Sequence, residues 1–200
     1  LYVVSDNAGF EEIAVSLDPD GSSVNVFTRE VAADGSSTIF VRAEIRDQSD
    51  NVYVDDNTSV IEFILSSDTF GDVVSKTVQV SSGQAETTFE SSEVAGDVQI
   101  EARIADGSLP SIDAIITVYA GEPVRLALSG DSTILPAGAE SVTNLHVEFF
   151  DVFNNRANNG FYTVTLEVEG GMELLDLFDE DLDQDGIQVT TPDGFLDFRV

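Results

Sequence analysis

Residues 33–47, ADGSSTIFVRAEIRD, carry the clearest structural pattern in the chain. A cluster of Asp, Gly and Ser opens the stretch, and such a cluster is typical of a tight turn. After it, apolar and mostly charged residues alternate strictly. The apolar set is Ile39, Val41, Ala43 and Ile45, and the set between them is Phe40, Arg42, Glu44 and Arg46. This alternation predicts a β-strand with one face on a core and the other in water.

Similar short runs recur every eight to fifteen residues along the chain, for example at 98–102 and 124–128. Clusters of Asp, Gly, Ser and Asn separate these runs, and helical periodicity is hard to find. Short alternating segments between turn residues are typical of antiparallel sheets. We therefore expect an all-β chain.

The sequence also repeats itself. Residues 33–47 match AGAESVTNLHVEFFD at 137–151, so that Asp151 corresponds to Asp47, 104 positions earlier. Two further pairs of segments follow in the same order, 59–65 with 163–168 and 78–89 with 187–200. A fourth similarity joins AGFEEIAVSL at 8–17 to AGDVQIEARI at 95–104. Internal repetition of this kind predicts domain boundaries.

A repeat of about 100 residues with about seven short strands has the size of an immunoglobulin-like sandwich. The predicted fold class is therefore all-β, with tandem immunoglobulin-like antiparallel β-sandwiches. We expect residues 1–20 to be the C-terminal strands of a preceding repeat and residues 21–120 to be a complete repeat. Residues 121–200 are expected to be most of a following repeat that lacks its last strands.

Composition narrows the possible functions. The 200 residues include 8 Lys and Arg against 38 Asp and Glu, a formal net charge of −30. Such a charge repels phosphate backbones and anionic lipids, so neither nucleic acid nor a membrane surface is an expected partner. No apolar run approaches the roughly 20 residues of a membrane-spanning helix, so we expect no membrane insertion of this segment. With no Cys and a single His, His146, the sequence gives no sign of an enzyme.

Several segments resemble the bacterial immunoglobulin-like repeats of invasin- and intimin-type surface adhesins. They are ADGSS at 33–37, DQSDNVYV at 47–54, VIEFIL at 60–65, SSGQAETTF at 81–89 and AGDVQIEARI at 95–104. The resemblance implies a rod of stacked modules that projects a binding tip from a microbial surface. It also implies an extracellular, cell-surface location.

The strongest local signal for a site is FDEDLDQDGIQV at 178–189. Asp181, Asp183 and Asp185 stand at alternate positions before Gly186, an arrangement in which carboxylates converge on a hard cation at a sharp turn. The backbone carbonyl of Ile187 would add a ligand. Asp179, Glu180, Asp193 or water would supply the rest. A full EF-hand is excluded, because its twelfth position, which requires Glu, is Pro192.

Repeat alignment points to the same segment. Twelve residues separate Leu65 from Val78 in the first copy, whereas eighteen separate Val168 from Ile187 in the second, and the extra length holds the acids. Calcium is the predicted cofactor, since magnesium tolerates irregular ligand geometry less well. The alternative is an acidic loop that is simply solvated.

The leading functional hypothesis is a structural repeat module of an extracellular adhesin, stalk or filament, stiffened by calcium. Its partners would be neighbouring repeats of the same chain or of the same protein in a fibre, and a host or cell-surface ligand. The alternatives are a carbohydrate- or protein-binding module and a non-catalytic spacer of a large secreted enzyme. The segment is either cut from a longer array or a subunit of a strand-exchanging polymer. A high-salt habitat is a second explanation for the acidity.

Side chains outside the acidic loop give weaker signals. His146 alternates with Leu145 and Val147 and is expected to face outward. It could serve as a catalytic base only if other strands brought a Ser and an Asp to it. Outward-facing phenylalanines are candidates for contact with a neighbouring repeat, and these are Phe40, Phe150 and Phe153.

Overall fold

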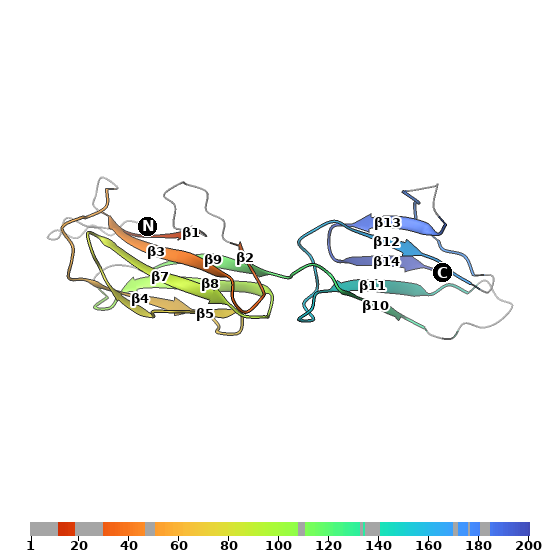
Figure 1. Ribbon diagram of the computed structural model, residues 1–200, viewed down its shortest axis with the longest axis horizontal. Helices are drawn as coiled ribbons and strands as arrows, with labels where there is room; N and C mark the ends of the chain where they lie inside the picture. The colour runs from red at the N-terminus through yellow and green to blue at the C-terminus, as the bar shows by residue number, and fades with distance from the viewer. Residues whose placement is uncertain are drawn as a thin grey trace. The chain divides into compact units, whose positions relative to one another are not determined.

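The structure is a computed structural model, in which the chain divides into two compact units, residues 1–119 and 120–200 (Figure 1). It describes residues 12–18, 30–46, 51–107, 111–132, 134, 141–169, 172–175, 177–180 and 185–200. These residues form strands β1 to β14 and no helix, so the expected all-β class is confirmed. The described part of the chain accordingly has no helix long and apolar enough to cross a membrane.

Unit 1 is a sandwich of two sheets. The first has the strand order β1 (Glu12–Asp18), β3 (Thr38–Arg46), β7 (Gln84–Ser91), β5 (Gly71–Val73). The second has the order β2 (Glu30–Ala32), β9 (Ile112–Tyr119), β8 (Gly96–Ile104), β4 (Val60–Leu65), β6 (Thr77–Gln79). Neighbouring strands are antiparallel except for β2 and β9, which run parallel.

The predicted alternation in β3 is confirmed. Its inward residues Ile39, Val41, Ala43 and Ile45 are at most 1% exposed, whereas Phe40 is 42% exposed. They join a core that includes Phe63 and Phe89. Burying such side chains contributes about 1.5–3 kcal/mol each, which is what holds the two sheets together.

Unit 2 has two smaller sheets. One has the order β10 (Arg125–Gly130), β11 (Asn144–Phe150), β14 (Phe195–Arg199), and the other pairs β12 (Tyr162–Leu166) with β13 (Ile187–Thr191). Its core contains Val147, Phe149 and Phe198, with Leu174 and Leu177 packed against it.

The two units share one strand plan. β11 follows β3 at the predicted spacing, and β12, β13 and β14 take the places of β4, β6 and β7. β10 takes the place of β1, because Glu12 lies opposite Arg46 and Arg125 lies opposite Phe150, the residue 104 positions after Arg46. Three of the four matched segment pairs therefore occupy equivalent positions.

The fourth match, between 8–17 and 95–104, was wrong. β1 lies beside β3 in one sheet, whereas β8 lies between β9 and β4 in the other. Apolar alternation is common to strands of both sheets, so it cannot tell them apart. The structure also differs from the expectation that residues 1–20 belong to a preceding repeat, because β1 pairs with β3 along its whole length and is part of unit 1.

Candidate functional site

The acidic segment lies between β12 and β13 in the sequence of unit 2, and its described residues Asp179 and Glu180 lie beside the outer edge of β13. Glu180 donates its backbone N–H to the carbonyl of Gln188 at 3.0 Å. In return, Asp179 Oδ1 accepts from Gln188 N at 3.1 Å, and Glu180 Oε1 accepts from Thr190 N at 3.2 Å. The two carboxylates thus accept hydrogen bonds from backbone N–H groups that β12 does not pair with at this edge of β13.

Gln188 holds the end of the loop in place. Its side chain is 4% exposed, and its Nε2 donates to the backbone carbonyl of Asp185 at 3.0 Å. Its Oε1 is buried and has no hydrogen-bond partner in the described part of the chain. An uncharged amide oxygen is a ligand type that calcium uses. Sequence reasoning missed Gln188, because nothing in the pattern of acids points to an amide after the loop.

Gly186 makes the turn from this loop into β13. Its φ is +89°, a region that favours glycine, and an added Cβ would lie 2.8 Å from Thr165 Cγ2 and 3.0 Å from the carbonyl oxygen of Leu166. The close approach of the loop to β12 therefore requires Gly186, in agreement with its expected role at a sharp turn.

The structure brings together only part of the predicted ligand set. Asp179, Glu180 and Asp185 belong to the loop around Gln188, and Ile187 is the first residue of β13, opposite Leu166. Asp181 and Asp183 lie outside the described residues. Among those described, no group of three or more His, Cys, Asp or Glu side chains is arranged to hold a metal ion.

Asp193 is not brought to the loop. It lies in the turn between β13 and β14, beyond the five residues of β13. An extended strand rises about 3.3 Å per residue, so β13 separates Asp193 from Asp185 by roughly 16 Å. The sequence suggested Asp193 only because it is near the other acids along the chain.

Other aspartates organise turns. Asp34 Oδ1 accepts from the N–H of Ser36 and of Ser37, and Asp34 Oδ2 accepts from the Ser37 hydroxyl. Hydrogen bonding, chiefly from the Ser37 side chain, lowers the pKa of Asp34 to about 2. The ADGSS cluster is therefore a turn closed by its own side chains.

Asp151 does the same in the interior of unit 2. Only 3% exposed, its carboxylate accepts from the N–H of Gly121, Phe153 and Asn155 at 2.8–3.0 Å. Burial alone would raise the pKa of Asp151, but the hydrogen bonds outweigh it and lower the pKa. Asp56, in unit 1, is 6% exposed and accepts from the N–H of Thr58 and Ser59, while its Oδ2 is buried without a partner in the described part of the chain.

His146 lies on the outer face of β11, as expected. Ser129 of β10 and Asp197 of β14 stand directly beside it, so neighbouring strands do bring a Ser and an Asp to the histidine. However, His146 Nδ1 contacts Asp197, and Nε2 faces Glu148 Oε1 at 3.7 Å. These interactions direct both ring nitrogens to carboxylates, which is not the arrangement of a base that activates a serine.

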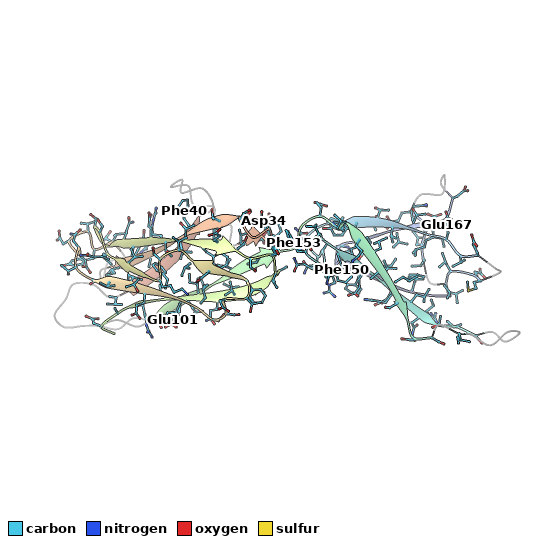
Figure 2. The ribbon with its side chains drawn as sticks, turned by 60° about the horizontal axis from the view of Figure 1, so that its bottom comes forward. Asp34, Phe40, Glu101, Phe150, Phe153 and Glu167 are labelled. Carbon is cyan, nitrogen blue, oxygen red and sulfur yellow. The ribbon has the colours of Figure 1, made fainter. Side chains whose placement is uncertain are left out.

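The three outward phenylalanines differ in their surroundings. Phe40 is exposed to solvent on β3. In contrast, the guanidinium of Arg125 lies 4.2 Å above the centre of the Phe150 ring. Phe153 is 37% exposed, and its backbone N–H donates to Asp151; Phe150 and Phe153 are both labelled in Figure 2. Because a cation above an aromatic ring is attracted to it, Arg125 is a partner for Phe150 within unit 2 itself.

The strand order, the turns and the tandem plan define a protein of two immunoglobulin-like β-sandwich units. Solved bacterial adhesins share this fold. InvD of Yersinia pseudotuberculosis matches 93% of this chain and 48% of its own, with a TM-score of 0.57 and 17% identity. Invasin, described as a bacterial integrin-binding protein, matches 94% of this chain and 34% of its own, with a TM-score of 0.51 and 13% identity.

A glycosyl hydrolase family 2 member from Bacteroides cellulosilyticus is also similar, over 56% of this chain and 14% of its own, with a TM-score of 0.46 and 17% identity. The chain thus spans less than half the length of each of these three proteins. No family model and no curated protein matches the sequence. The likeness to invasin-type adhesin repeats is confirmed as a likeness of fold.

Proposed function

We propose that this chain is a structural module of an extracellular, cell-surface adhesin, stalk or filament. The observation that carries the proposal is the tandem plan: two successive units with the same strand positions, in a fold shared with InvD and invasin. Each unit resists unfolding through its buried core and interstrand hydrogen bonds. Neighbouring repeats of the same chain or fibre are its partners, and the role involves no catalytic step.

We also propose that calcium stiffens unit 2 at the loop before β13. Asp181, Asp183 and Asp185 supply carboxylates, and Asp179 and the Ile187 carbonyl add two further oxygens. Asp193, which the sequence also suggested, is left out of this set because β13 lies between it and the loop. Gln188 supports this assignment, because its buried Oε1, which has no hydrogen-bond partner among the described residues, adds an oxygen at the base of the same loop. A cation there would also relieve the repulsion among the neighbouring carboxylates.

Thermal unfolding with calcium and with a chelator tests this part of the proposal. Calcium at about 100 times its Kd should stabilise the folded state by about 2.7 kcal/mol, and the chelator should remove that gain. The double substitution D183N and D185N should abolish the response. D193N is the matched control, because Asp193 lies at the other end of β13. An unchanged melting temperature on chelation, or equal loss of the response in D193N, would contradict the calcium site.

A further inference from the structure

The outer face of the sheet β10–β11–β14 holds the one histidine of the chain between two carboxylates. β11 lies between β10 and β14, so His146 has Ser129 on one side and Asp197 on the other (Figure 1). Glu148 stands two residues further along β11 and therefore points to the same face. All three side chains are partly exposed, His146 at 34%, Glu148 at 32% and Asp197 at 67%. The cluster is thus open to ions from solvent.

Asp197 determines which ring nitrogen of His146 carries the hydrogen. The ionised carboxylate is only an acceptor, so in its contact with Nδ1 the hydrogen belongs to Nδ1. In the neutral ring the other nitrogen, Nε2, then has a free lone pair. A carboxylate that holds a histidine in this way fixes the tautomer and the orientation of the ring, which is the usual arrangement behind a metal-binding imidazole.

Nε2 of the same ring faces Glu148. The distance from Nε2 to Glu148 Oε1 is 3.7 Å, too long for a hydrogen bond. In the neutral ring both atoms are acceptors, so they repel each other unless a proton or a metal cation lies between them. Zinc binds imidazole nitrogen and carboxylate oxygen at about 2.0–2.2 Å, which places two such ligands roughly 3.4 Å apart on a tetrahedral ion. The observed separation is close to this value.

The neighbouring strands leave room for an ion beside this pair of atoms. On β10, Ser129 lies opposite His146. Ala127 lies opposite Glu148, and both β10 residues are small. On β14, Phe195 lies opposite Glu148, and its ring centre is 5.5 Å from that of the imidazole. The pair is therefore flanked by an aromatic ring on the β14 side and is accessible over β10.

We propose that His146 and Glu148 bind a zinc ion, with Asp197 as the positioning residue. His146 Nε2 and a carboxylate oxygen of Glu148 are the two protein ligands, and water takes the remaining positions. Among the described residues no three His, Cys, Asp or Glu side chains are arranged around one ion, so this site has fewer ligands than a closed structural zinc centre. The ion accordingly exchanges with solvent and is not needed for folding.

The ligand chemistry distinguishes this site from the loop before β13. Calcium takes oxygen ligands, whereas imidazole nitrogen suits zinc. In the described part of the chain, the ion-pair contacts of Glu148 and Asp197 are with His146, and neither carboxylate pairs with an Arg or Lys. A divalent cation therefore supplies positive charge that the cluster otherwise lacks.

A zinc titration of the 200-residue chain, followed by NMR of the His146 ring, tests the proposal. Excess calcium is present throughout, at about pH 8, so that charge screening stays constant and the ring is largely neutral. We expect the ring signals to shift and to saturate, with Nε2 as the bound nitrogen. Because the chain has one histidine, these signals report on this site alone.

Substitutions around the ring give a matched set. E148Q removes the charged ligand and should weaken zinc binding by about tenfold or more. D197N should weaken it by about 10–100-fold, the usual effect of losing the carboxylate behind a metal-binding histidine. S129A is the control, because Ser129 flanks His146 on the opposite strand and is not a ligand, and it should bind zinc within about twofold of the original chain. Core signals of Phe149 check that each variant is folded.

Three results would overturn the zinc site. The first is a set of ring signals that zinc does not move, and the second is zinc bound to Nδ1. The third is an E148Q variant that binds zinc as tightly as the original chain, since the histidine alone would then be the ligand. None of these outcomes depends on the calcium loop or on a surface location, so the proposed function stands or falls separately.

Discussion

Some carboxylates of this acidic chain organise the turns in which they lie. Asp34, Asp56 and Asp151 each accept hydrogen bonds from the backbone amides of the next few residues. Each bond satisfies a donor that the turn would otherwise leave unpaired. Repeat alignment singled out Asp151 by its match to Asp47. Its role as acceptor for Gly121 depends on a contact 30 positions away, which a sequence pattern does not contain.

Asp151→Asn should destabilise unit 2 by about 1–3 kcal/mol, because an amide nitrogen would face buried donors. The pKa of Asp151 is lowered in the folded state. The carboxylate therefore contributes fully to the free energy of unfolding above the ordinary pKa of 3.8, and this contribution is lost as the pH falls through the lower folded pKa. Urea unfolding at pH 7 and pH 3 should therefore show a smaller difference between original and variant at pH 3. The exposed Asp193→Asn is the control. Equal effects of the two substitutions at pH 7 would contradict the role of Asp151.

His146 gives a second titration with the opposite sign. The hydrogen bond to Asp197 raises the pKa of His146 above 6.5, burial opposes this, and the charges of Asp197 and Glu148 add to it. Protonated His146 therefore stabilises folded unit 2 fully below about pH 6.5, and this stabilisation is lost as the pH rises through the raised pKa of the folded state. Asp197→Asn should lower the pKa of His146 toward 6.5, and Ser129→Ala should leave it unchanged. Because the chain has one histidine, its ring signals in an NMR titration report this directly. An unchanged titration in Asp197→Asn would rule out the pairing.

At the scale of strands, alternation and repetition predicted much of the fold, and they failed for identifiable reasons. Residues 38–46 alternate cleanly because β3 has one face on the core and one in water. The match of 8–17 with 95–104 misled because β1 and β8 alternate alike, although their neighbours are different. Pairing is a contact between distant residues, so sequence period alone does not fix it.

The loop before β13 was predicted in part. Its acids and Gly186 were visible as a pattern, because spacing and a glycine turn are local properties. The separation of Asp193 from the loop depends on the length of β13. The hydrogen bond from the Gln188 side chain to the Asp185 carbonyl depends on the burial of Gln188 at the end of the loop. Both require the strand boundaries and the packing, which the spacing of acids does not reveal.

Gly186→Ala should test the close approach of this loop to β12. The substitution combines a strained φ with a Cβ only 2.8 Å from Thr165, so we expect a loss of about 3 kcal/mol in unit 2. Gly107→Ala is the matched control: its φ is +71°, and no atom of the residues that the structure describes lies within 4 Å of the added Cβ. That control should lose only about 1 kcal/mol. Chemical denaturation followed by NMR signals of each unit measures both changes. Similar losses in the two variants would show that the steric contact with Thr165 is unimportant.

At the scale of the whole molecule, the charge is shared by both units. Residues 1–119 contain 22 acidic and 5 basic residues, and residues 120–200 contain 16 and 3. Both units are therefore strongly acidic, and self-repulsion destabilises each folded state. The acidic insertion between β12 and β13 belongs to unit 2 alone. Screening of charge by salt should therefore stabilise both units, whereas a specific calcium site should stabilise unit 2 alone.

Monovalent salt and calcium should separate these two explanations of the acidity. Raising NaCl from about 0.01 M to 1 M shortens the screening length from about 30 Å to 3 Å, so both units should unfold at higher temperature. Calcium added at constant ionic strength should raise the unfolding temperature of unit 2 only, and the effect should saturate, because a site fills whereas screening does not. NMR melting curves of core signals, Phe89 for unit 1 and Phe149 for unit 2, distinguish the two responses. If calcium raises the unfolding temperature of both units equally, or adds to the NaCl response without saturation, the loop binds no specific ion. The acidity would then be explained by a high-salt habitat.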